Sequence, residues 1–382
     1  MKIDLNKIPI IDNHTHPFPT NRENPSFERY WSISLIPQPV FNTRHTILFQ
    51  MVMKEMARYF GMPENSSPDE IIDQRNRLYQ GNPKEYVTDL YTAANVEQFL
   101  VDFGYPIKGK RLTEDEIKEF YYLTSNFKIG NVIRIEYITD DVIKEGLEYA
   151  DFVKKYIETI YKEIKDRKLI ALKSVIAYFT GLDVIKHDEN EVKNAYQTYL
   201  IDPKDRIAEK IIRDHIFFLS VGICFEQKLP LQIHTGFGDS PLCDLRVTNP
   251  LLLKNVLDDE VCQKTSLILI HSGYPFVNEE AFLVSHYPNL YMDISEMVPF
   301  ASMAIETKLM DILEMAPVSK VLYGSDGGGI PEHSWFAAIY FRQALGRILN
   351  NLIGGGFISE SFAAEAAHLM LAENAKRIYS LQ

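Results

Sequence analysis

The stretch IPIIDNHTH, residues 8–16, places two histidines directly after a short apolar segment. Residues two apart on an extended strand point to the same side, so His14 and His16 can direct both imidazoles at one metal ion from a single strand end. Pairs of this kind also arise by chance in polar turns. The residues that accompany the pair elsewhere in the chain therefore decide between a metal site and a turn.

Seven further apolar segments of strand length follow, each succeeded by a longer stretch with helical spacing. This alternation is typical of βα units around a parallel sheet. Eight units predict an α/β fold, a distorted (β/α)8 TIM barrel, although six or seven units in an open doubly wound sheet would give a similar pattern. The predicted strands are Ile8–Asn13, Gln98–Asp102, Val132–Tyr137, Leu169–Ile176, Pro230–His234, Ser266–His271, Leu290–Ile294 and Lys320–Asp326.

Polar residues that can bind a metal ion or a proton lie at the ends of five of these strands. Active sites of barrels are built at the carboxyl ends of the strands, where these residues fall. A single buried histidine at a strand end is usually a satisfied core residue, but two in matched His-Thr-Gly and His-Ser-Gly settings favour a site. A buried carboxylate at the last strand needs a cation or a network of donors. The residues are His14 with His16, Lys173, His234, His271 and Asp326.

A long insertion, residues 17–94, separates the first two predicted strands and contains helical patterns at His45–Phe60 and Pro68–Tyr79. Its many aromatic residues predict a lid or pocket wall over the catalytic face, with contacts between subunits as the equal alternative. Ser359–Tyr379 reads as two short helices that could close the bottom of the barrel. Because the sequence contains no internal repeat or Pro/Ser-rich linker, we expect one domain over residues 1–382.

Composition excludes several classes of protein. Forty Lys and Arg against 52 Asp and Glu give a formal net charge of −12, which argues against a nucleic-acid or membrane-coating function. Three scattered cysteines favour a reducing compartment over a disulfide framework, and the N-terminus lacks the apolar core of a signal peptide. We therefore expect a cytoplasmic protein with a small-molecule substrate, no nucleic-acid or membrane partner, and homo-oligomeric assembly.

Six phrases of the sequence resemble the amidohydrolase superfamily, in particular its amidohydrolase-2 branch and the FluG/nodulin-type domains, some of which are fused to glutamine-synthetase-like domains. The resemblance runs from Asp12 to about Tyr379 and implies a barrel with a divalent metal, commonly zinc, at its carboxyl-end face. The phrases are DNHTHPF, LKSVIAYFTGL, LQIHTGFGD, LILIHSGYPF, LYMDIS and VLYGSD.

The resemblance also implies roles for individual residues. Asp326 is a metal ligand and the general base, and His271 binds a second metal ion or orients water or substrate. Lys173 stands where some members carry a carbamylated lysine between two metal ions, but it could equally remain an ammonium that binds a substrate carboxylate. One or two ions are therefore expected. The ligands implied for the first ion are His14, His16, His234 and Asp326.

One departure concerns specificity: Phe179 stands where relatives carry an arginine, so a guanidinium would have to come from Arg134 or Arg246. Several polar residues are predicted inside or at the mouth of the barrel, where they would orient ligands or form buried ion pairs; these include Asp102 and Asp293. Those named as substrate-binding candidates are Arg134, Glu136, Tyr178 and Asp239. Five histidines are expected in structural positions: His45, His187, His215, His286 and His368. His333, after the last strand, is expected in a solvated loop, with a position at the mouth of the barrel as the alternative.

These residues predict metal-assisted hydrolysis, in which an activated water attacks an amide bond of a small carboxylic or amino acid. Asp326 would take the proton of the water and deliver it to the leaving group. A metal-dependent non-oxidative decarboxylase or a lactonase of the same branch is the alternative within enzymes. An inactive barrel that serves as a binding subunit is the alternative outside enzymes, and the intact set of ligands argues against it.

Overall fold

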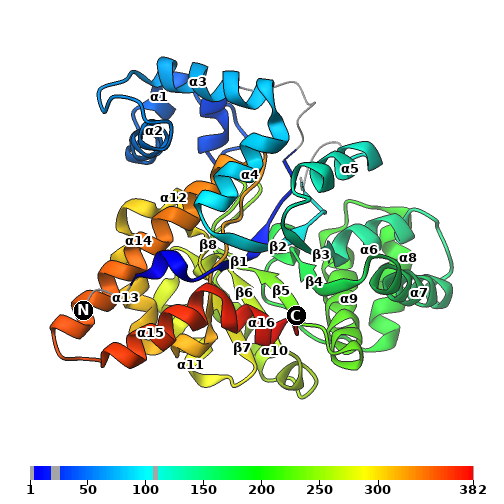
Figure 1. Cartoon of the computed structure of the whole chain (residues 1–382). Helices are drawn as coiled ribbons and strands as arrows, with labels where there is room; N and C mark the ends of the chain where they lie inside the picture. Colours follow the sequence, from blue (N-terminus) through cyan, green and yellow to red (C-terminus); the bar gives the residue numbers. More distant parts are fainter. Residues whose placement is uncertain (1–3, 19–25, 106–110, 382) are drawn as a thin grey trace.

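A computed structural model describes residues 4–18, 26–105 and 111–381, and its centre is a sheet of eight parallel strands (Figure 1). Neighbouring strands follow the order β1-β2-β3-β4-β5-β6-β7-β9, so each βα unit adds the next strand. The strands are β1 (Ile10–Thr15), β2 (Val96–Asp102), β3 (Lys128–Arg134), β4 (Leu169–Ser174), β5 (Leu231–His234), β6 (Leu267–Ile270), β7 (Leu290–Asp293) and β9 (Val321–Leu322), with a two-residue β8 (Ser295–Glu296) outside the sheet.

The first and last strands meet, which closes the barrel. The backbone N–H of Asn13 donates to the carbonyl of Tyr323 (2.9 Å), and the N–H of Asp326 donates to the carbonyl of His14 (2.8 Å). The predicted (β/α)8 barrel is thus confirmed, with all eight strands near their expected positions. Only the first part of the predicted last strand is regular, because its continuation to Asp326 bends over the end of β1.

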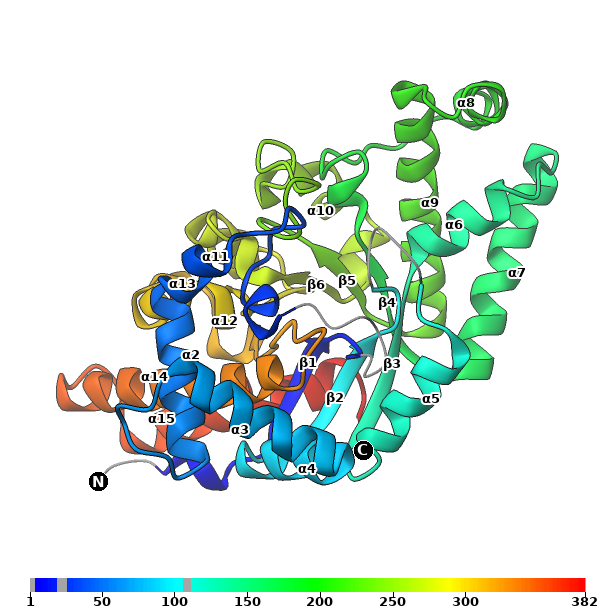
Figure 2. The ribbon, with the colours of Figure 1, turned by 90° about the horizontal axis from the view of Figure 1, so that it is seen from above.

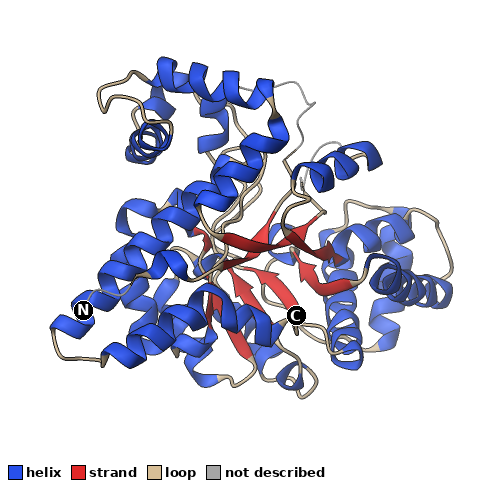
Figure 3. Ribbon diagram, viewed as in Figure 1, coloured by secondary structure: helices blue, strands red, loops and turns tan. Residues whose placement is uncertain are grey.

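Helices surround the sheet on its outer side (Figures 2 and 3). No helix in the described parts of the chain has the length and apolar character that a membrane crossing requires. The helices that follow β2 to β9 are α5 (Glu114–Leu123), α6 (Ile135–Ile143), α7 (Tyr149–Arg167), α8 (Glu189–Ile201), α9 (Arg206–Gln227), α10 (Lys254–Leu257), α11 (Val277–His286), α12 (Met297–Phe300), α13 (Ile305–Met315) and α14 (Glu332–Gly354).

The C-terminal stretch closes the bottom of the barrel. It comprises α15 (Glu360–His368), a π-helical turn (Leu369–Glu373) and α16 (Asn374–Ile378), where two short helices were predicted. Inward-facing side chains of the strands and the end of this stretch form one apolar cluster, so the interior is packed rather than open. Its members include Ile11, Leu100, Val132, Ala171, Ile268, Leu322, Ala375, Ile378 and Tyr379.

The insertion after β1 forms a helical layer beside the barrel (Figure 2). Ser67 caps α3 in a reciprocal capping box with Glu70, and Pro68 occupies the first helical turn, where its missing N–H costs nothing. The predicted helices at residues 45–60 and 68–79 correspond to α2 and α3, and residues 19–25 of the insertion lie outside the described residues. Its helices are α1 (Val40–Arg44), α2 (Ile47–Tyr59), α3 (Pro68–Gly81) and α4 (Pro83–Ala93).

A buried ion pair connects this layer to the barrel. Arg75 on α3 donates from Nε to Oε1 of Glu332 on α14 (2.5 Å), and the hydroxyl of Tyr86 donates to the same oxygen (2.8 Å). Glu332 is completely buried and Arg75 is 6% exposed. Removal of one partner leaves the other charge buried without a counter-ion, which is costly.

We therefore expect Glu332→Gln to lower the free energy of unfolding by about 3–5 kcal/mol, because Arg75 keeps its buried charge without a counter-ion. Urea unfolding followed by circular dichroism measures the change. Asp166→Asn is the matched control, since Asp166 and Lys162 form an exposed pair that contributes little to stability. Equal unfolding midpoints for the two variants would contradict the assigned role of the ion pair.

Candidate active site

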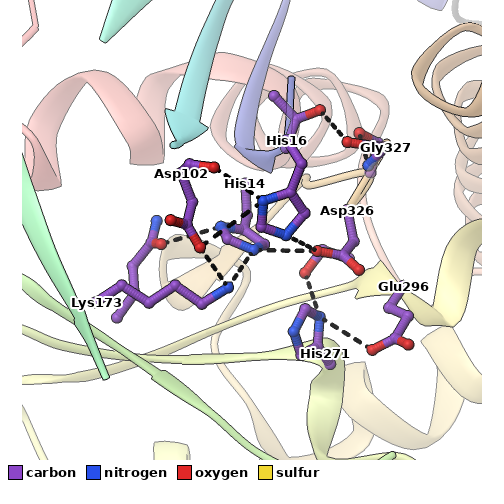
Figure 4. A network of polar contacts seen from close by, with 12 residues as sticks. His14, His16, Asp102, Lys173, His271, Glu296, Asp326 and Gly327 are labelled. Carbon is purple, nitrogen blue, oxygen red and sulfur yellow. Dashed lines mark hydrogen bonds and ion pairs between the residues drawn. The ribbon is translucent and has the colours of Figure 1, made fainter. Parts of the chain in front are cut away.

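A cavity of about 870 Å³, its open mouth included, lies at the carboxyl ends of the strands. Its wall combines strand-end residues with side chains from the insertion and from α14. Figure 4 shows the polar cluster at its base. The lining residues are His16, Arg29, Tyr30, Ser32, Ile33, Leu35, Tyr105, Arg134, Lys173, Val175, Tyr178, His234, Asp239, His271, Glu296, Phe300, Asp326, Gly328 and His333.

His14, His16 and Asp326 converge in this cluster. Nε2 of His14 and Nε2 of His16 each lie 3.1 Å from Oδ1 of Asp326. Asp326 follows His14 and His16 by more than 300 residues in the sequence. The closure of the barrel between β1 and the segment after β9 brings the three side chains together. The structure thus places three of the four residues predicted to hold the first metal ion in direct contact.

The second ring nitrogen of each of these histidines is held from behind. Nδ1 of His14 lies 3.1 Å from Oε1 of Gln232, and Nδ1 of His16 lies 3.0 Å from the backbone carbonyl of Asp102. Because both partners are acceptors, Nδ1 carries the proton and the lone pair of Nε2 faces Asp326. Burial, together with the nearby Lys173 ammonium, lowers the pKa of His14 to about 3, so its imidazole is neutral at pH 7.

Lys173 lies between these residues and a buried carboxylate. Its Nζ is 2.7 Å from Nε2 of His14 and 3.1 Å from Oδ2 of Asp102, which also accepts from Nε of Arg134 (2.7 Å). Burial alone would raise the pKa of Asp102, but the guanidinium and the ammonium hold it well below its usual range. Asp102 and Arg134 therefore form the buried ion pair that the sequence left as an alternative.

His234 and His271 occupy the neighbouring part of the cluster. Their ring centroids are 4.5 Å apart, and the centroids of His14 and His271 are 5.5 Å apart. Ligand atoms of His234, His271 and Glu296 lie within 4.8 Å of one another, as do those of His14, His271 and Asp326. His271 thus links the fourth predicted ligand, His234, to the group around Asp326. In the described chain, Nε2 of His234 has no hydrogen-bond partner.

Asp293, at the end of β7, fixes the orientation of His271. Its Oδ1 accepts from the backbone N–H of His271 (2.9 Å) and from the Ser295 hydroxyl (2.7 Å), and that hydroxyl lies 2.9 Å from Nδ1 of His271. Asp293 also accepts from the side chain of Asn13 (2.6 Å). The predicted orienting role of this carboxylate agrees with these contacts.

Three residues of the cluster have left-handed backbones that non-glycine residues seldom adopt: His271 (φ 78°), Glu296 (φ 59°) and Asp326 (φ 53°). Such conformations cost about 1–3 kcal/mol each and persist where the surrounding structure imposes them. At Asp326 the preceding residue is fixed, because Ser325 donates from its backbone (2.9 Å) and its hydroxyl (2.5 Å) to Asp12. Rigid strand ends therefore present these side chains.

Three of the four substrate-binding candidates, Arg134, Tyr178 and Asp239, line the cavity. Glu136 does not. The predicted strand Val132–Tyr137 ends at Arg134, and Glu136 lies in the first turn of α6, where it accepts from the Ser174 hydroxyl (2.6 Å) and the backbone N–H of Val175 (3.0 Å). The prediction that Glu136 lies inside or at the mouth of the barrel was wrong, and this residue instead holds the end of β4.

The two arginines proposed to supply a guanidinium, Arg134 and Arg246, lie in different environments. Arg134 is buried at the cavity, whereas the side chain of Arg246 is 88% exposed and pairs with Asp244. Phe179, which replaces an arginine of relatives, lies under the guanidinium of Arg213, whose Cζ is 3.9 Å from the ring centroid. Arg134 is thus the guanidinium that the strands supply to the cavity.

Sequence reasoning missed three of the lining residues: Arg29, Tyr105 and Glu296. Tyr105 and Glu296 each follow a strand end by three residues, a position that could have identified them. For His333 the less favoured alternative, a position at the mouth, agrees with the structure, because it lies in the first turn of α14, is 5% exposed and lines the cavity. The other five histidines with predicted structural roles lie outside the cavity lining.

Comparison with known proteins agrees with this geometry. The amidohydrolase family model matches residues 202–381, which include His234, His271 and Asp326. Protein fluG of Emericella nidulans is 24% identical over 410 residues that cover 98% of this chain and 46% of fluG, so the chain spans about half the length of this curated relative.

Solved structures share the fold. A Lactobacillus casei protein assigned as a metal-dependent hydrolase has a TM-score of 0.82 at 20% identity, with 98% of this chain and 96% of that chain covered. A uronate isomerase of Thermotoga maritima has a TM-score of 0.65 at 13% identity, with 98% and 95% covered. At these identities the likeness concerns the architecture of the barrel.

Proposed function

Since the chain belongs to the amidohydrolase family, we propose that it is a metal-dependent hydrolase that cleaves the C–N bond of an amide in a small carboxylate-bearing substrate. The observation that carries the proposal is the convergence of the His14 and His16 imidazoles on Oδ1 of Asp326 in a cavity. The carboxylate-binding part of the proposal depends on Arg134.

The donor set fits a divalent metal ion, and zinc is the ion that we infer. Nε2 of His14 and Nε2 of His16 carry lone pairs, the first of which lies 2.7 Å from Nζ of Lys173, while Nε2 of His234 is buried without a partner among the described residues. Imidazole nitrogens with a carboxylate oxygen form typical catalytic zinc sites. We assign His14, His16, His234 and Asp326 as ligands, with His271, and Lys173 once carbamylated, available to a second ion. When bound, the metal supplies an acidified water molecule and polarises the scissile carbonyl.

Asp326 acts as the general base in this proposal. It accepts a proton from the attacking water and then delivers it to the leaving nitrogen. Burial alone would raise the pKa of Asp326, but the electrostatic influence of His271 holds it well below its usual range, so the carboxylate is ionised and can accept. His271, fixed through Asp293 and Ser295, donates from Nδ1 to the Ser295 hydroxyl, so its Nε2 offers a lone pair that orients the attacking water or binds a second ion.

Arg134 binds the carboxylate of the substrate. Its Nε is committed to Asp102, whereas Nη1 is buried without a hydrogen-bond partner among the described residues. A buried guanidinium with an unpaired Nη1 suits a carboxylate oxygen, and an unpaired buried donor costs about 1–3 kcal/mol that such a ligand would recover. Arg29 and Tyr30 of the insertion complete the wall, which supports a role of residues 17–94 as a lid that excludes water.

Metal removal tests the proposal. Elemental analysis of the purified protein should find about one or two equivalents of a transition metal, because one or two ions fit the donor set. Dialysis against a chelator should abolish hydrolysis of a panel of γ-glutamyl and N-acyl amides, and added zinc should restore it. A folded, metal-free preparation that retains turnover would overturn the mechanism.

The product distinguishes the competing reactions. Amide hydrolysis releases an amine and a carboxylate, whereas decarboxylation releases carbon dioxide and lactone opening releases no amine. A uronate isomerase reaction, which the Thermotoga maritima neighbour performs by its name, would interconvert an aldehyde and a ketone. Turnover of a carboxylic acid, a lactone or a uronate with no activity on any amide would replace the proposed hydrolase by that enzyme.

A further inference from the structure

His333 is a buried imidazole on the wall of the cavity that the proposed mechanism does not use. Three aromatic rings surround it, two of them from the insertion. Its ring centroid is 4.6 Å from that of Trp31, 5.8 Å from Phe300 and 6.4 Å from Tyr30. Packing on several sides fixes the ring, so its free nitrogen has a defined position.

The hydrogen bonds of His333 identify which nitrogen carries the proton. Hydrogen bonds to the backbone of Tyr30 and of Gly328 both stabilise the protonated ring. In both, a ring N–H therefore donates to a backbone carbonyl. Nε2 has no partner among the described residues, so the bonds belong to Nδ1. Burial lowers the pKa of His333, which keeps the imidazole neutral. Nε2 therefore presents a lone pair.

An acceptor that is buried without a partner costs about 1–3 kcal/mol, which a donor from a bound molecule would recover. Among the residues that line the cavity, five have a buried side-chain atom without a hydrogen bond: Arg134, His234, Glu296, Asp326 and His333. His234, Glu296 and Asp326 belong to groups that could hold a metal ion. Arg134 and His333 remain for the substrate, one as a donor and the other as an acceptor.

We propose that His333 determines substrate specificity, and that its Nε2 accepts a hydrogen bond from a hydroxyl or amino group that the substrate carries in addition to its carboxylate. The inference rests on the proposed function only for the statement that this cavity binds the substrate. It narrows the substrate class from carboxylates in general to hydroxy or amino acid derivatives. A site built to bond such a group rejects the analogue that lacks it, because the acceptor then stays unpaired.

Binding of three probes tests this inference without turnover. Glutarate, 2-hydroxyglutarate and glutamate share two carboxylates and differ at one carbon, and calorimetric titration of the zinc-loaded protein gives their dissociation constants. We expect the hydroxyl or the amino compound to bind at least about tenfold tighter than glutarate, as one well-formed hydrogen bond allows. In His333→Phe, which keeps an aromatic ring against Trp31, this preference should fall to about one.

The variant comparison is decisive, because a hydroxyl or amino group could also bind the metal ion directly. That contribution is the same in wild type and in His333→Phe, whereas a contribution of Nε2 disappears. His333→Gln offers an amide oxygen and should restore part of the preference. Circular dichroism and metal content confirm that each variant is folded and loaded.

Two results would overturn the inference: an unchanged preference in His333→Phe, or equal or undetectable binding of all three probes by the wild type. Parallel assays on the amide panel keep it separable from the proposed function. Loss of the preference in His333→Phe together with no amide hydrolysis by wild type would retain the role of His333 and reject the hydrolase. Amide hydrolysis by the wild type, with equal binding of the three probes, would retain the hydrolase and reject the role of His333.

Discussion

Asp326→Asn is expected to lower kcat by at least about 10³-fold while the fold and part of the bound metal remain, because asparagine cannot accept the proton of the attacking water. Nε2 of His14 and Nε2 of His16 lie 3.1 Å from Oδ1, which faces the proposed metal ion, so Oδ2 is the oxygen left to act as the base. Steady-state kinetics on the best amide substrate measures the loss.

The backbone dictates the choice of asparagine. Asp326 has a φ of 53°, a left-handed conformation that asparagine tolerates better than alanine, so Asp326→Ala would mix strain with the loss of the base. The hydrogen bond from its N–H to the carbonyl of His14 stays in the variant. Asp244→Asn is the matched control, because Asp244 pairs with Arg246 at the surface. A kcat within tenfold of wild type for Asp326→Asn would remove Asp326 from the role of general base.

Much of this site could be predicted because strand periodicity and barrel topology together fix positions. Each of His234, His271 and Asp326 ends or follows a short apolar segment, and parallel strands in a barrel place all such ends on one face. The contact of His14 with Asp326 then follows from the closure of the sheet. Neither step required knowledge of side-chain packing.

Glu136 shows where the same reasoning failed. The segment VIRIEY alternates apolar and polar residues and was predicted as one strand, yet the strand ends at Arg134. The apolar spacing of Ile135, Ile138 and Val142 is helical, so the signal for α6 was present. The predicted strand was therefore three residues too long, and the carboxylate of Glu136, which holds the end of β4, was wrongly placed at the site.

Residues that reach the cavity from the insertion and from α14 could not be placed in this way. Arg29 and Tyr30 line it because the insertion packs against the barrel through contacts such as Arg75 with Glu332, and no periodicity encodes that packing. For His333 a local signal existed, since a proline and an acidic residue precede it as at many helix starts. Its burial depends on aromatic rings from the insertion.

His16→Asn is expected to reduce bound metal to less than about a tenth of an equivalent and to abolish activity with it, because a metal site that loses one of its few ligands binds far more weakly. Asparagine is too short to bring a donor atom to the position of Nε2, which lies 3.1 Å from Oδ1 of Asp326. Elemental analysis after gel filtration and amide hydrolysis measure the two losses. His286→Asn, a change at an exposed histidine of α11, is the control.

Stability and metal binding can be separated in this variant. The His16 ring stacks on Tyr105 with centroids 4.8 Å apart, so some loss of stability is expected without any metal. Activity should return in part at high zinc concentration if the defect is weak binding, since mass action refills the site. It should not return if the cavity has collapsed. A folded His16→Asn protein with a full equivalent of metal and normal turnover would show that the ion is held elsewhere, and the proposed catalytic arrangement around Asp326 would fail with it.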